Sequence, residues 1–574
     1  MDRLNADPQV DPEIIQLRES TVRPPQKYRF VVPSLLLLVY LAQCAWFIGT
    51  QSLTIDEPNH IRAGLEQWRT GQYSGGMGWN DHPPLSRLLC TIPAINQKFQ
   101  VPNPKPETPH TYPTGDRKTV LPSPAAMAWH TRPVNAVLGA ILGLLLWTAA
   151  RSLYSTSAAN LALALFAFSP SLIAHFSLAG TNDGVMALMT FATTFQLYWW
   201  RHERSLFQTG LLGLVLGGLL LAKTASLPLF TAAVGLVLIL KADAVSLWPN
   251  EWNWKDAATV LIISFLVVWG AYRFHVSRIT LSANDIRVRV AIPKRPDPIV
   301  YQPAQPVSVS LPVPAYEFVQ GIWFRIKDNK EGHPGFLLGH SYYGGSRAYF
   351  PMTVLLKWPT VVLFLSLVAI LMVVSRRMRL PRDFALWAIF PVLYFVFALF
   401  TRVNIGERHI LPVYPFALLL CAGLWELTKG RRAVLALIVL ALAVHAFDVL
   451  RYAPDYLSYF NLFVSPTNSY KLLSDSNVDW GEGLIALRKY QQAYSNEVIH
   501  LAYSGTIDPV VYGVHALPLM PNQRVSGTVI ISANYLSGQT LEDPNSYHWV
   551  LQYPRKAILN HSLHVFEVPA QNTP

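Results

Sequence analysis

The sequence predicts a polytopic α-helical membrane protein, with about 11 transmembrane helices and an extracytoplasmic α+β domain at the C-terminal end. Three observations support this fold class. Hydrophobic residues make up 51% of the 574 residues and charged residues only 14%, against about 25% charged in a typical soluble protein. The apolar residues gather in blocks of about 20, which is the length that crosses a bilayer as a helix. Residues 451–574 lack such blocks. Disordered, collagen-like and disulfide-rich chains are excluded by this composition, and a soluble enzyme is disfavoured.

The chain begins with a polar segment, residues 1–28, which we expect in the cytoplasm. No small-residue cleavage site follows the first apolar block, so we expect that block to be a retained anchor and not a cleaved signal peptide. Eleven apolar windows then predict spans near 31–50, 129–150, 157–175, 184–200, 206–222, 225–240, 257–274, 352–375, 384–401, 409–427 and 433–450.

Positive residues set the orientation of these spans, because Lys and Arg concentrate in the short cytoplasmic loops. With the N-terminus inside, the inner segments hold Arg3, Arg18, Arg23, Lys27, Arg29, Arg151, Arg201, Arg204, Lys241, Lys255, Arg376, Arg377, Arg379, Arg382, Lys429, Arg431 and Arg432. The short outer loops hold chiefly Lys223, Arg402 and Arg408. We therefore predict a multi-pass protein of the cytoplasmic (inner) membrane, with its N-terminus inside and its C-terminus outside. The net charge of +12 then reflects topology and attraction to membrane lipids, and no nucleic-acid partner is implied.

Residues 29–450 form the predicted transmembrane domain, and its large outer loops cover about 51–128 and 275–351. In the first loop Ile61, Leu65 and Trp68 share a helical face suited to the membrane interface, and the proline-rich stretch from Pro102 to Pro124 predicts an extended loop. In 451–574, helical periodicity near 484–490 precedes strand-like runs such as VIHLAY, VSGTVIIS and SLHVFEV, which predict an α+β domain. The three cysteines are too few and too scattered for a disulfide framework or a clustered zinc site.

Directly after the first span, two adjacent carboxylates, Asp56 and Glu57, precede Pro58, and His60 follows within one helical turn. A carboxylate at this membrane edge suits a general base that takes a proton from an acceptor hydroxyl or amine. The alternative is that one of them caps the helix that begins at Pro58. Two acids exceed the need of one cap, so the spacing favours a functional role.

Two further outer motifs are ambiguous when taken alone. Asp81-His82-Pro83-Pro84 fits a turn before a helix that begins at Leu85. The stretch from His175 to Asp183 ends in Thr181-Asn182-Asp183, which suits the capping of the fourth span. In isolation, the structural interpretation is the better one for both.

Cationic and aromatic residues also lie at the outer membrane edge. Lys223 separates two apolar spans, where a lysine is costly unless it meets water or an anion; the simpler interpretation is that it snorkels to the surface. Arg408 follows Glu407 in a charged outer loop, and it suits either a phosphate or a structural ion pair. Tyr342 and Tyr343 lie among glycines before the eighth span and suit an interfacial belt as well as a ligand site.

Taken in order, these motifs resemble those of the GT-C membrane glycosyltransferases. The closest resemblance is to the bacterial polyprenyl-phosphate-dependent relatives of the dolichyl-phosphate-mannose protein O-mannosyltransferases and of the lipid A aminoarabinose transferase. The segments that carry the resemblance are Asp56-Glu57, His82-Pro83-Pro84-Leu85, Ser169-Pro170 to Asp183, Lys223, Tyr349-Phe350-Pro351 with Lys357, Arg408-His409-Ile410-Leu411-Pro412 with Pro415, and Ser474-Asp475-Ser476-Asn477-Val478-Asp479-Trp480-Gly481.

The resemblance implies a GT-C fold and an inverting transfer of a sugar from a polyprenyl-phosphate donor to a protein, lipid or glycan acceptor at the outer face of the membrane. It implies that Asp56 is the base, with Glu57 as its partner or as the group that orients the acceptor, and Asp183 as a second acidic position. Lys223 would contact the lipid phosphate, aided by Arg408. As weaker substrate contacts we note His60, His82, Tyr342 and Tyr343.

The resemblance implies no nucleotide cofactor, since the lipid already activates the sugar. No ligand spacing demands a metal, although a divalent cation near Asp56 and Asp183 stays open. The 275–351 loop is too short for the MIR domain of the eukaryotic protein mannosyltransferases, which disfavours protein mannosylation in particular. The motifs identify neither the sugar nor the acceptor. Two other classes remain as alternatives. A multi-span transporter or lipid flippase predicts repeated halves and ionisable pairs within spans, and a non-catalytic envelope assembly factor predicts a degenerate site.

Overall fold

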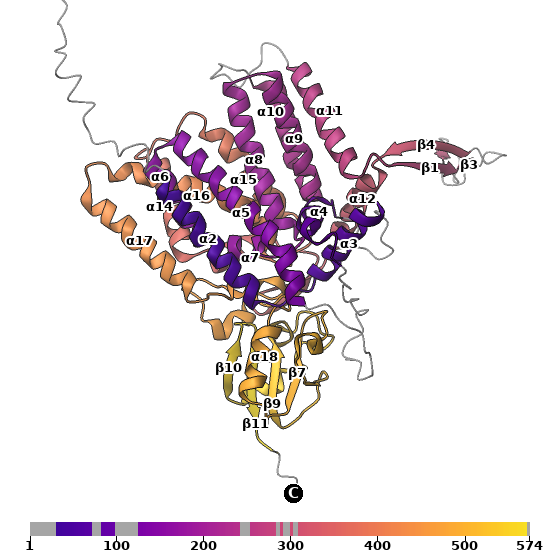
Figure 1. The fold of residues 1–574 in the computed structure, drawn as a ribbon, viewed down its shortest axis with the longest axis vertical. Coiled ribbons are helices and arrows are strands. Elements are labelled where there is room, and N and C mark those ends of the chain that lie inside the picture. The colour runs from indigo at the N-terminus through magenta and orange to yellow at the C-terminus, as the bar shows by residue number, and fades with distance from the viewer. Residues whose placement is uncertain are drawn as a thin grey trace, which may run out of the picture.

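The computed structural model describes residues 30–71, 82–97, 124–240, 253–282, 288–290, 299–301 and 308–570. A large body of helices occupies most of the molecule, and a smaller part with a β-sheet packs against one end of it (Figure 1). The N-terminal segment 1–28 and nearly all of the proline-rich stretch lie outside the described residues.

Every apolar window of the sequence coincides with one helix or with a run of consecutive helices. The helices of this body are α2 (Val31–Thr50), α5 (Pro124–Leu153), α6 (Thr156–Ala167), α7 (Pro170–Phe176), α8 (Asn182–His202), α9 (Leu206–Ala222), α10 (Leu227–Ile239), α11 (Trp254–Ala271), α13 (Tyr349–Lys357), α14 (Thr360–Val374), α15 (Phe384–Leu399), α16 (Tyr414–Ala422) and α17 (Arg432–Leu450). The short 3₁₀ helices η4 (Thr224–Ser226), η6 (Glu407–Val413) and η7 (Gly423–Thr428) extend α10 and α16.

Among the described residues, five helices are long and apolar enough to cross a membrane, or up to seven if each of two bent pairs is one span. The pairs are α6 with α7, bent by 65°, and α13 with α14, bent by 115°. Each break lies at a proline, Pro170 or Pro359, which lacks the amide hydrogen that would continue a helix. Because four further apolar helices are shorter than a full span, the count of eleven spans stays a prediction.

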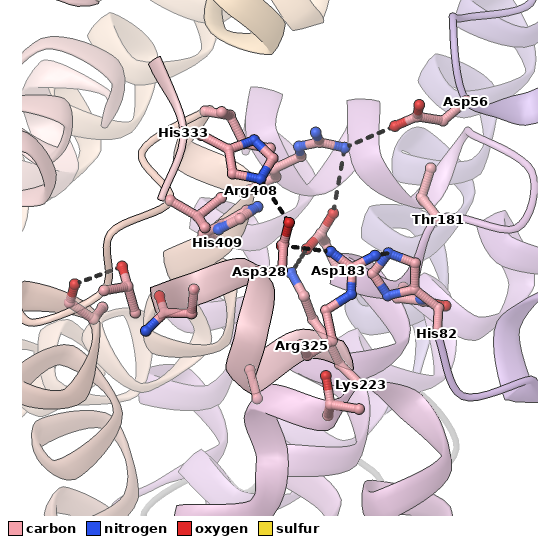
Figure 2. A pocket seen from close by; sticks show the side chains of 18 of the residues that line it. Asp56, His82, Thr181, Asp183, Lys223, Arg325, Asp328, His333, Arg408 and His409 are labelled. Carbon is pink, nitrogen blue, oxygen red and sulfur yellow. Dashed lines mark hydrogen bonds and ion pairs between the residues drawn. The ribbon is translucent and has the colours of Figure 1, made fainter. Parts of the chain in front are cut away.

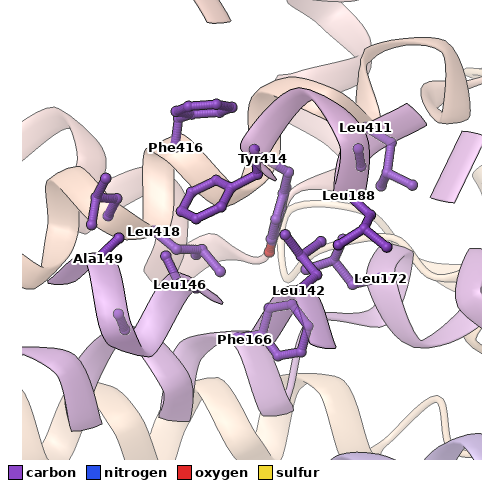
Figure 3. Close-up of a cluster of buried hydrophobic side chains, with 14 of the residues drawn as sticks. Leu142, Leu146, Ala149, Phe166, Leu172, Leu188, Leu411, Tyr414, Phe416 and Leu418 are labelled. Atoms are coloured by element: carbon purple, nitrogen blue, oxygen red, sulfur yellow. The ribbon is translucent and has the colours of Figure 1, made fainter. Parts of the chain in front are cut away.

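The core of the helical body lies between α5, α6, α7, α8 and α16. Leu142, Phe166, Leu172, Leu188 and Tyr414 meet there and are buried (Figure 3). By contrast α14 and α17 leave many leucines, valines and phenylalanines exposed. In a membrane protein such side chains face the lipid. The helices that carry them can lie in lipid, because a helix satisfies its own backbone hydrogen-bonding groups without water.

The outer connections form additional elements beside the helical body. These are α3 (Glu57–Thr70), α4 (Leu85–Thr91), α12 (Tyr316–Glu331), the paired strands β1 (Val276–Ser282) and β4 (Ser308–Pro314), the pair β2 (Val288–Val290) and β3 (Ile299–Tyr301), and the pair β5 (Pro334–Leu337) and β6 (His340–Tyr343). Strands β1 and β4 form an arm that extends away from the helices near α12 (Figure 1). The apolar face predicted on α3 packs within the protein, since Ile61 and Leu65 are buried with Cys90 of α4.

The part after α17 contains a five-stranded sheet in the order β10-β11-β9-β7-β8. Its strands are β7 (Ile499–Ala502), β8 (Leu517–Pro518), β9 (Gly527–Ser532), β10 (Arg555–Leu559) and β11 (Leu563–Val568). The pairs β10–β11 and β11–β9 are antiparallel, whereas β7 pairs in parallel with β9 and β8. Helix α18 (Leu484–Ala493) packs on this sheet, and Leu484, Leu487 and Tyr490 on one face of it are buried. These elements coincide with the helical and strand-like runs of the sequence.

Backbone hydrogen bonds join this C-terminal part to the chain that leaves α2. The amide of Ser52 donates to the carbonyl of Glu482 (3.0 Å), and the amide of Ile55 donates to the carbonyl of Trp480 (3.0 Å). These two bonds hold the extended segment before α3 at two positions, Ser52 and Ile55. It positions the residue that follows it, Asp56, where the helices and the C-terminal part meet.

Candidate active site

A cavity of about 1070 Å³ lies where the helical body meets α12 and the C-terminal part. Its polar lining comes from distant segments of the chain. The acidic, basic and histidine residues among those that line it are Asp56, His60, His82, Asp183, Lys223, Arg325, Asp328, His333, Arg408, His409, Asp475 and Asp479. The cavity therefore brings together residues from five of the outer motifs of the sequence, those that contain Asp56, His82, Asp183, Lys223 and Arg408. Figure 2 shows how these five side chains converge.

Asp56 occupies the N-cap position of α3, yet its side chain makes no capping hydrogen bond. The carboxylate instead lies in the cavity, where its Oδ2 is 3.4 Å from Nη1 of Arg408. Its side chain is 20% exposed, so it is reachable from the cavity. The capping interpretation thus does not account for Asp56, and its carboxylate is available for chemistry.

Glu57 points the opposite way and does not line the cavity. Its carboxylate is fully buried and accepts from Nε (2.8 Å) and Nη2 (2.7 Å) of Arg132. It also accepts from the backbone amides of Thr54 (2.8 Å) and Ala179 (2.7 Å). With both oxygens used by four donors, Glu57 holds the turn that carries Asp56.

Asp183 and Lys223 form a tight ion pair inside the cavity. Asp183 lies in the first turn of α8, and Lys223 lies between α9 and η4. Lys223 Nζ is 2.6 Å from Asp183 Oδ1, while Nη1 of Arg408 is 4.0 Å from Asp183 Oδ2. Asp183 therefore lies between two cations, as Figure 2 shows. Lys223 does not snorkel away from the protein, because its charged end is largely buried at this pair.

Arg408, at the start of η6, is the connection between the two carboxylates. Its contacts to Asp56 and Asp183 are long for charge-assisted hydrogen bonds, which are usually 2.7–2.9 Å. Its guanidinium lies over the indole ring of Trp480, with 3.9 Å between Cζ and the ring centroid. The cavity thus holds a cation whose donors are only loosely engaged by protein carboxylates, an arrangement that suits an incoming anion.

Two of the histidines that line the cavity, His60 and His82, are neutral near pH 7. Burial, more than the charges of its neighbours, lowers the pKa of His60 to about 4. Burial, and then the charge of Arg325, lowers the pKa of His82 well below its usual value. Nε2 of His82 accepts from Nη2 of Arg325 at 2.9 Å, so the ring carries its proton on Nδ1. Both rings therefore add polarity to the wall without adding charge near pH 7.

Helix α12 contributes residues that the sequence analysis missed. Arg325 pairs with Asp328 (3.0 Å), which in turn lies 2.9 Å from Nε2 of His333 (Figure 2). Nothing in the sequence marks this group, because an Arg–Asp pair three residues apart is common on solvent-facing helices. Trp480 and Asp475 also line the cavity, although they entered the sequence analysis only through the family resemblance.

The two tyrosines noted in the sequence lie outside the cavity lining. Tyr342 in β6 donates its hydroxyl to Oδ1 of Asn404 (3.1 Å), and Tyr343 is 67% exposed. They therefore belong to the surface of the β5–β6 pair. Among the described residues no group of three or more His, Cys, Asp or Glu side chains is arranged to hold a metal ion.

Comparison with known families bears on the helical body. Residues 126–269 match the sequence model of the family described as dolichyl-phosphate-mannose-protein mannosyltransferase. This segment begins in α5 and ends in α11, and it contains Asp183 and Lys223. No curated protein sequence matches the chain.

Several solved structures have a similar fold at low sequence identity. The S. cerevisiae protein O-mannosyltransferase Pmt1–Pmt2 complex bound to the sugar donor is 12% identical, with a TM-score of 0.48 over 77% of this chain and 91% of that chain. ArnT from Cupriavidus metallidurans bound to undecaprenyl phosphate is 12% identical, with a TM-score of 0.46 over 95% and 99%. The apo oligosaccharyltransferase of Archaeoglobus fulgidus is 12% identical, with a TM-score of 0.45 over 76% of this chain and 56% of that chain. Over residues 126–269 the chain is therefore similar to the family described as dolichyl-phosphate-mannose-protein mannosyltransferase, and the resemblance that the motifs predict is confirmed.

Proposed function

We propose that this chain is an inverting glycosyltransferase that moves a sugar from a polyprenyl-phosphate donor to an acceptor at the outer face of the cytoplasmic membrane. The observation that carries the proposal is the composition of one cavity. Asp56, a carboxylate with no capping role, faces the same space as Lys223 and Arg408. A base and two cations are the groups that an acceptor proton and a phosphate leaving group require.

Inversion at the anomeric carbon needs one displacement and therefore one base. In the proposed reaction the acceptor oxygen forms a bond to the anomeric carbon while the bond from that carbon to the phosphate oxygen breaks. The acceptor proton passes to Asp56, and the electron pair of the broken bond leaves with the polyprenyl phosphate. Asp56 suits this step because its oxygen is engaged only at 3.4 Å by Arg408.

The leaving phosphate gains charge as the bond breaks, and the cations Lys223 and Arg408 would stabilise it. Asp183 and Asp56 together balance these two cations and so keep the charge in the cavity paired. Apolar residues line the same cavity toward the membrane helices, among them Leu227, Phe397 and Ala398. A polyprenyl chain fits such a wall, and the family match to enzymes described by a dolichyl-phosphate donor supports a lipid-linked substrate.

The test uses purified full-length protein in lipid and a panel of polyprenyl-phosphate sugars, with cell extract as the source of acceptor. Release of free polyprenyl phosphate is followed by mass spectrometry. We expect release with at least one sugar and a fall of about 100-fold or more for Asp56→Asn, the usual size of a general-base contribution. The matched control is Glu66→Gln, which neutralises an exposed carboxylate on the same helix.

Three results would contradict the proposal. Undiminished release by Asp56→Asn would remove the base from its proposed role. An equal loss of polyprenyl-phosphate release in Glu66→Gln would show that the activity depends on the overall charge of α3 and not on the carboxylate in the cavity. No release from any donor in the panel would favour a transporter or a non-catalytic assembly factor.

A further inference from the structure

Trp480 lies between the C-terminal part and the cavity, in the loop that precedes α18. The residue is buried and lines the cavity. One contact of its indole is the guanidinium of Arg408, 3.9 Å from Cζ to the ring centroid. A second is the ring of His175 in α7, edge-on at 6.2 Å between centroids. The indole therefore fills the space between α7 and the start of η6.

The backbone of the same residue holds the segment that leads to Asp56. The carbonyl of Trp480 accepts from the amide of Ile55 at 3.0 Å, and the amide of Trp480 donates to Oε2 of Glu482 at 2.7 Å. On the far side of the segment, Oγ1 of Thr506 donates to the carbonyl of Ile55 at 3.0 Å. One residue thus touches Arg408 through its side chain and the neighbour of Asp56 through its backbone.

The loop around Trp480 also holds the backbone that precedes Arg408. Oγ of Ser476 donates to the carbonyl of Ile405 (2.6 Å), and Oδ1 of Asn477 accepts from the amide of Glu407 (2.9 Å). Gly406 permits this approach, because a Cβ at that position would clash with Oγ of Ser476. The C-terminal part therefore holds the main chain directly before Arg408, whose side chain lies in the cavity.

The direction of the Arg408 side chain depends on few polar contacts. Its Nη1 lies 3.4 Å from Asp56 and 4.0 Å from Asp183, and its Nε has no hydrogen-bond partner among the described residues. The indole ring of Trp480 lies beside the guanidinium, 3.9 Å from Cζ to the ring centroid. Stacking orients a guanidinium without using its N–H groups, which point outward in the plane and stay free for an anion.

We propose that Trp480 is a positioning residue that holds the guanidinium of Arg408 in the phosphate-binding direction, so that the C-terminal part is an integral piece of the reaction site. The inference rests on the proposed function for the identity of the anion, a lipid-linked phosphate. The contact between the indole of Trp480 and the guanidinium of Arg408 does not depend on which anion binds.

Kinetics of three variants test the role. Trp480→Leu removes the aromatic face, and we expect the KM for the donor to rise about 5- to 30-fold, in line with a desolvated cation–π contact, while kcat changes less. Trp480→Phe keeps an aromatic face and should restore most of the donor affinity. Trp549→Leu, which removes an indole elsewhere in the C-terminal part, should leave both constants near those of the wild type.

A double-mutant cycle separates positioning from general damage. If Trp480 acts through Arg408, then Trp480→Leu should have little further effect on the KM in an Arg408→Gln background. Effects that multiply in the double variant would overturn the proposal, as would a Trp480→Phe variant no better than Trp480→Leu.

The same cycle on melting temperature needs no substrate. We expect the loss of melting temperature in the Trp480→Leu/Arg408→Gln variant to be clearly smaller than the sum of the two single losses. Additive losses would overturn the stacking role even if sugar transfer is confirmed. A wild type that releases no polyprenyl phosphate but shows a non-additive cycle would overturn the proposed function and leave the positioning of Arg408 by Trp480 intact.

Discussion

At the scale of single residues, the neighbours Asp56 and Glu57 carry the same functional group, a carboxylate, but differ in their surroundings and therefore in their roles. Both are carboxylates at the start of α3, and the sequence analysis treats them as a pair. In the structure the Asp56 carboxylate faces the cavity, whereas that of Glu57 is enclosed by Arg132 and two backbone amides. The difference comes from Arg132, 75 residues away. We therefore assign the chemistry to Asp56 and the support of its turn to Glu57.

This assignment predicts that Glu57→Gln acts first on stability. The change leaves the buried guanidinium of Arg132 without its counter-charge, and breaking a buried pair in this way costs about 3–5 kcal/mol. We expect a marked fall in melting temperature, measured in lipid nanodiscs beside the exposed control Glu66→Gln. If Glu57→Gln instead melts like the wild type and only sugar transfer is lost, Glu57 takes part in the chemistry directly.

At the scale of elements, the loop before α18 contains a buried carboxyl group, that of Glu482, close to the candidate active site. Glu482 is buried, its Oε2 accepts from the amide of Trp480 and its Oε1 has no partner among the described residues. Burial, and then the negative charge of Asp479, raises the pKa of Glu482 to about 8. The charge of Asp455 acts in the same direction. The folded protein therefore keeps a proton on Glu482 at pH 7, where the unfolded chain has lost it.

The sign of the pH dependence follows from this raised pKa. Between the unfolded pKa of about 4.3 and about 8 the folded state binds the extra proton, so the contribution of Glu482 to stability falls as the pH rises through this window. Glu482→Gln is neutral at every pH and keeps an acceptor for Trp480. We expect the melting temperature of this variant, relative to that of the wild type, to rise from pH 5 to about pH 8 and to change little at higher pH, where Glu482 is ionised in both states. Parallel melting curves across that range would contradict the assignment of the proton.

At the scale of the whole molecule, the sequence predicts those features that depend on local pattern. The apolar windows coincide with helices, because a block of about 20 apolar residues is the pattern of a helix that crosses a bilayer. The runs around Ile499, Gly527 and Leu563 coincide with strands, because short stretches rich in β-branched and aromatic residues are typical of strands. The contact between Trp480 and Arg408 joins residues 72 positions apart in different parts of the fold. Only the packing of the C-terminal part against the helices brings them together, and no spacing in the sequence encodes that.

The proposed reaction needs the cavity at the outer face, and thiol labelling tests this orientation. The three native cysteines, Cys44, Cys90 and Cys421, are buried and should react little, which gives a low background. Glu542 in the C-terminal part and Arg431 in the predicted inner loop before α17 are both exposed. We expect Glu542→Cys to react with a membrane-impermeant maleimide in intact spheroplasts of a bacterial expression host, because that side carries few positive loop residues. Arg431→Cys should react only after the membrane is opened. The reverse labelling pattern would place the cavity in the cytoplasm, where a base and two cations would meet a different set of acceptors.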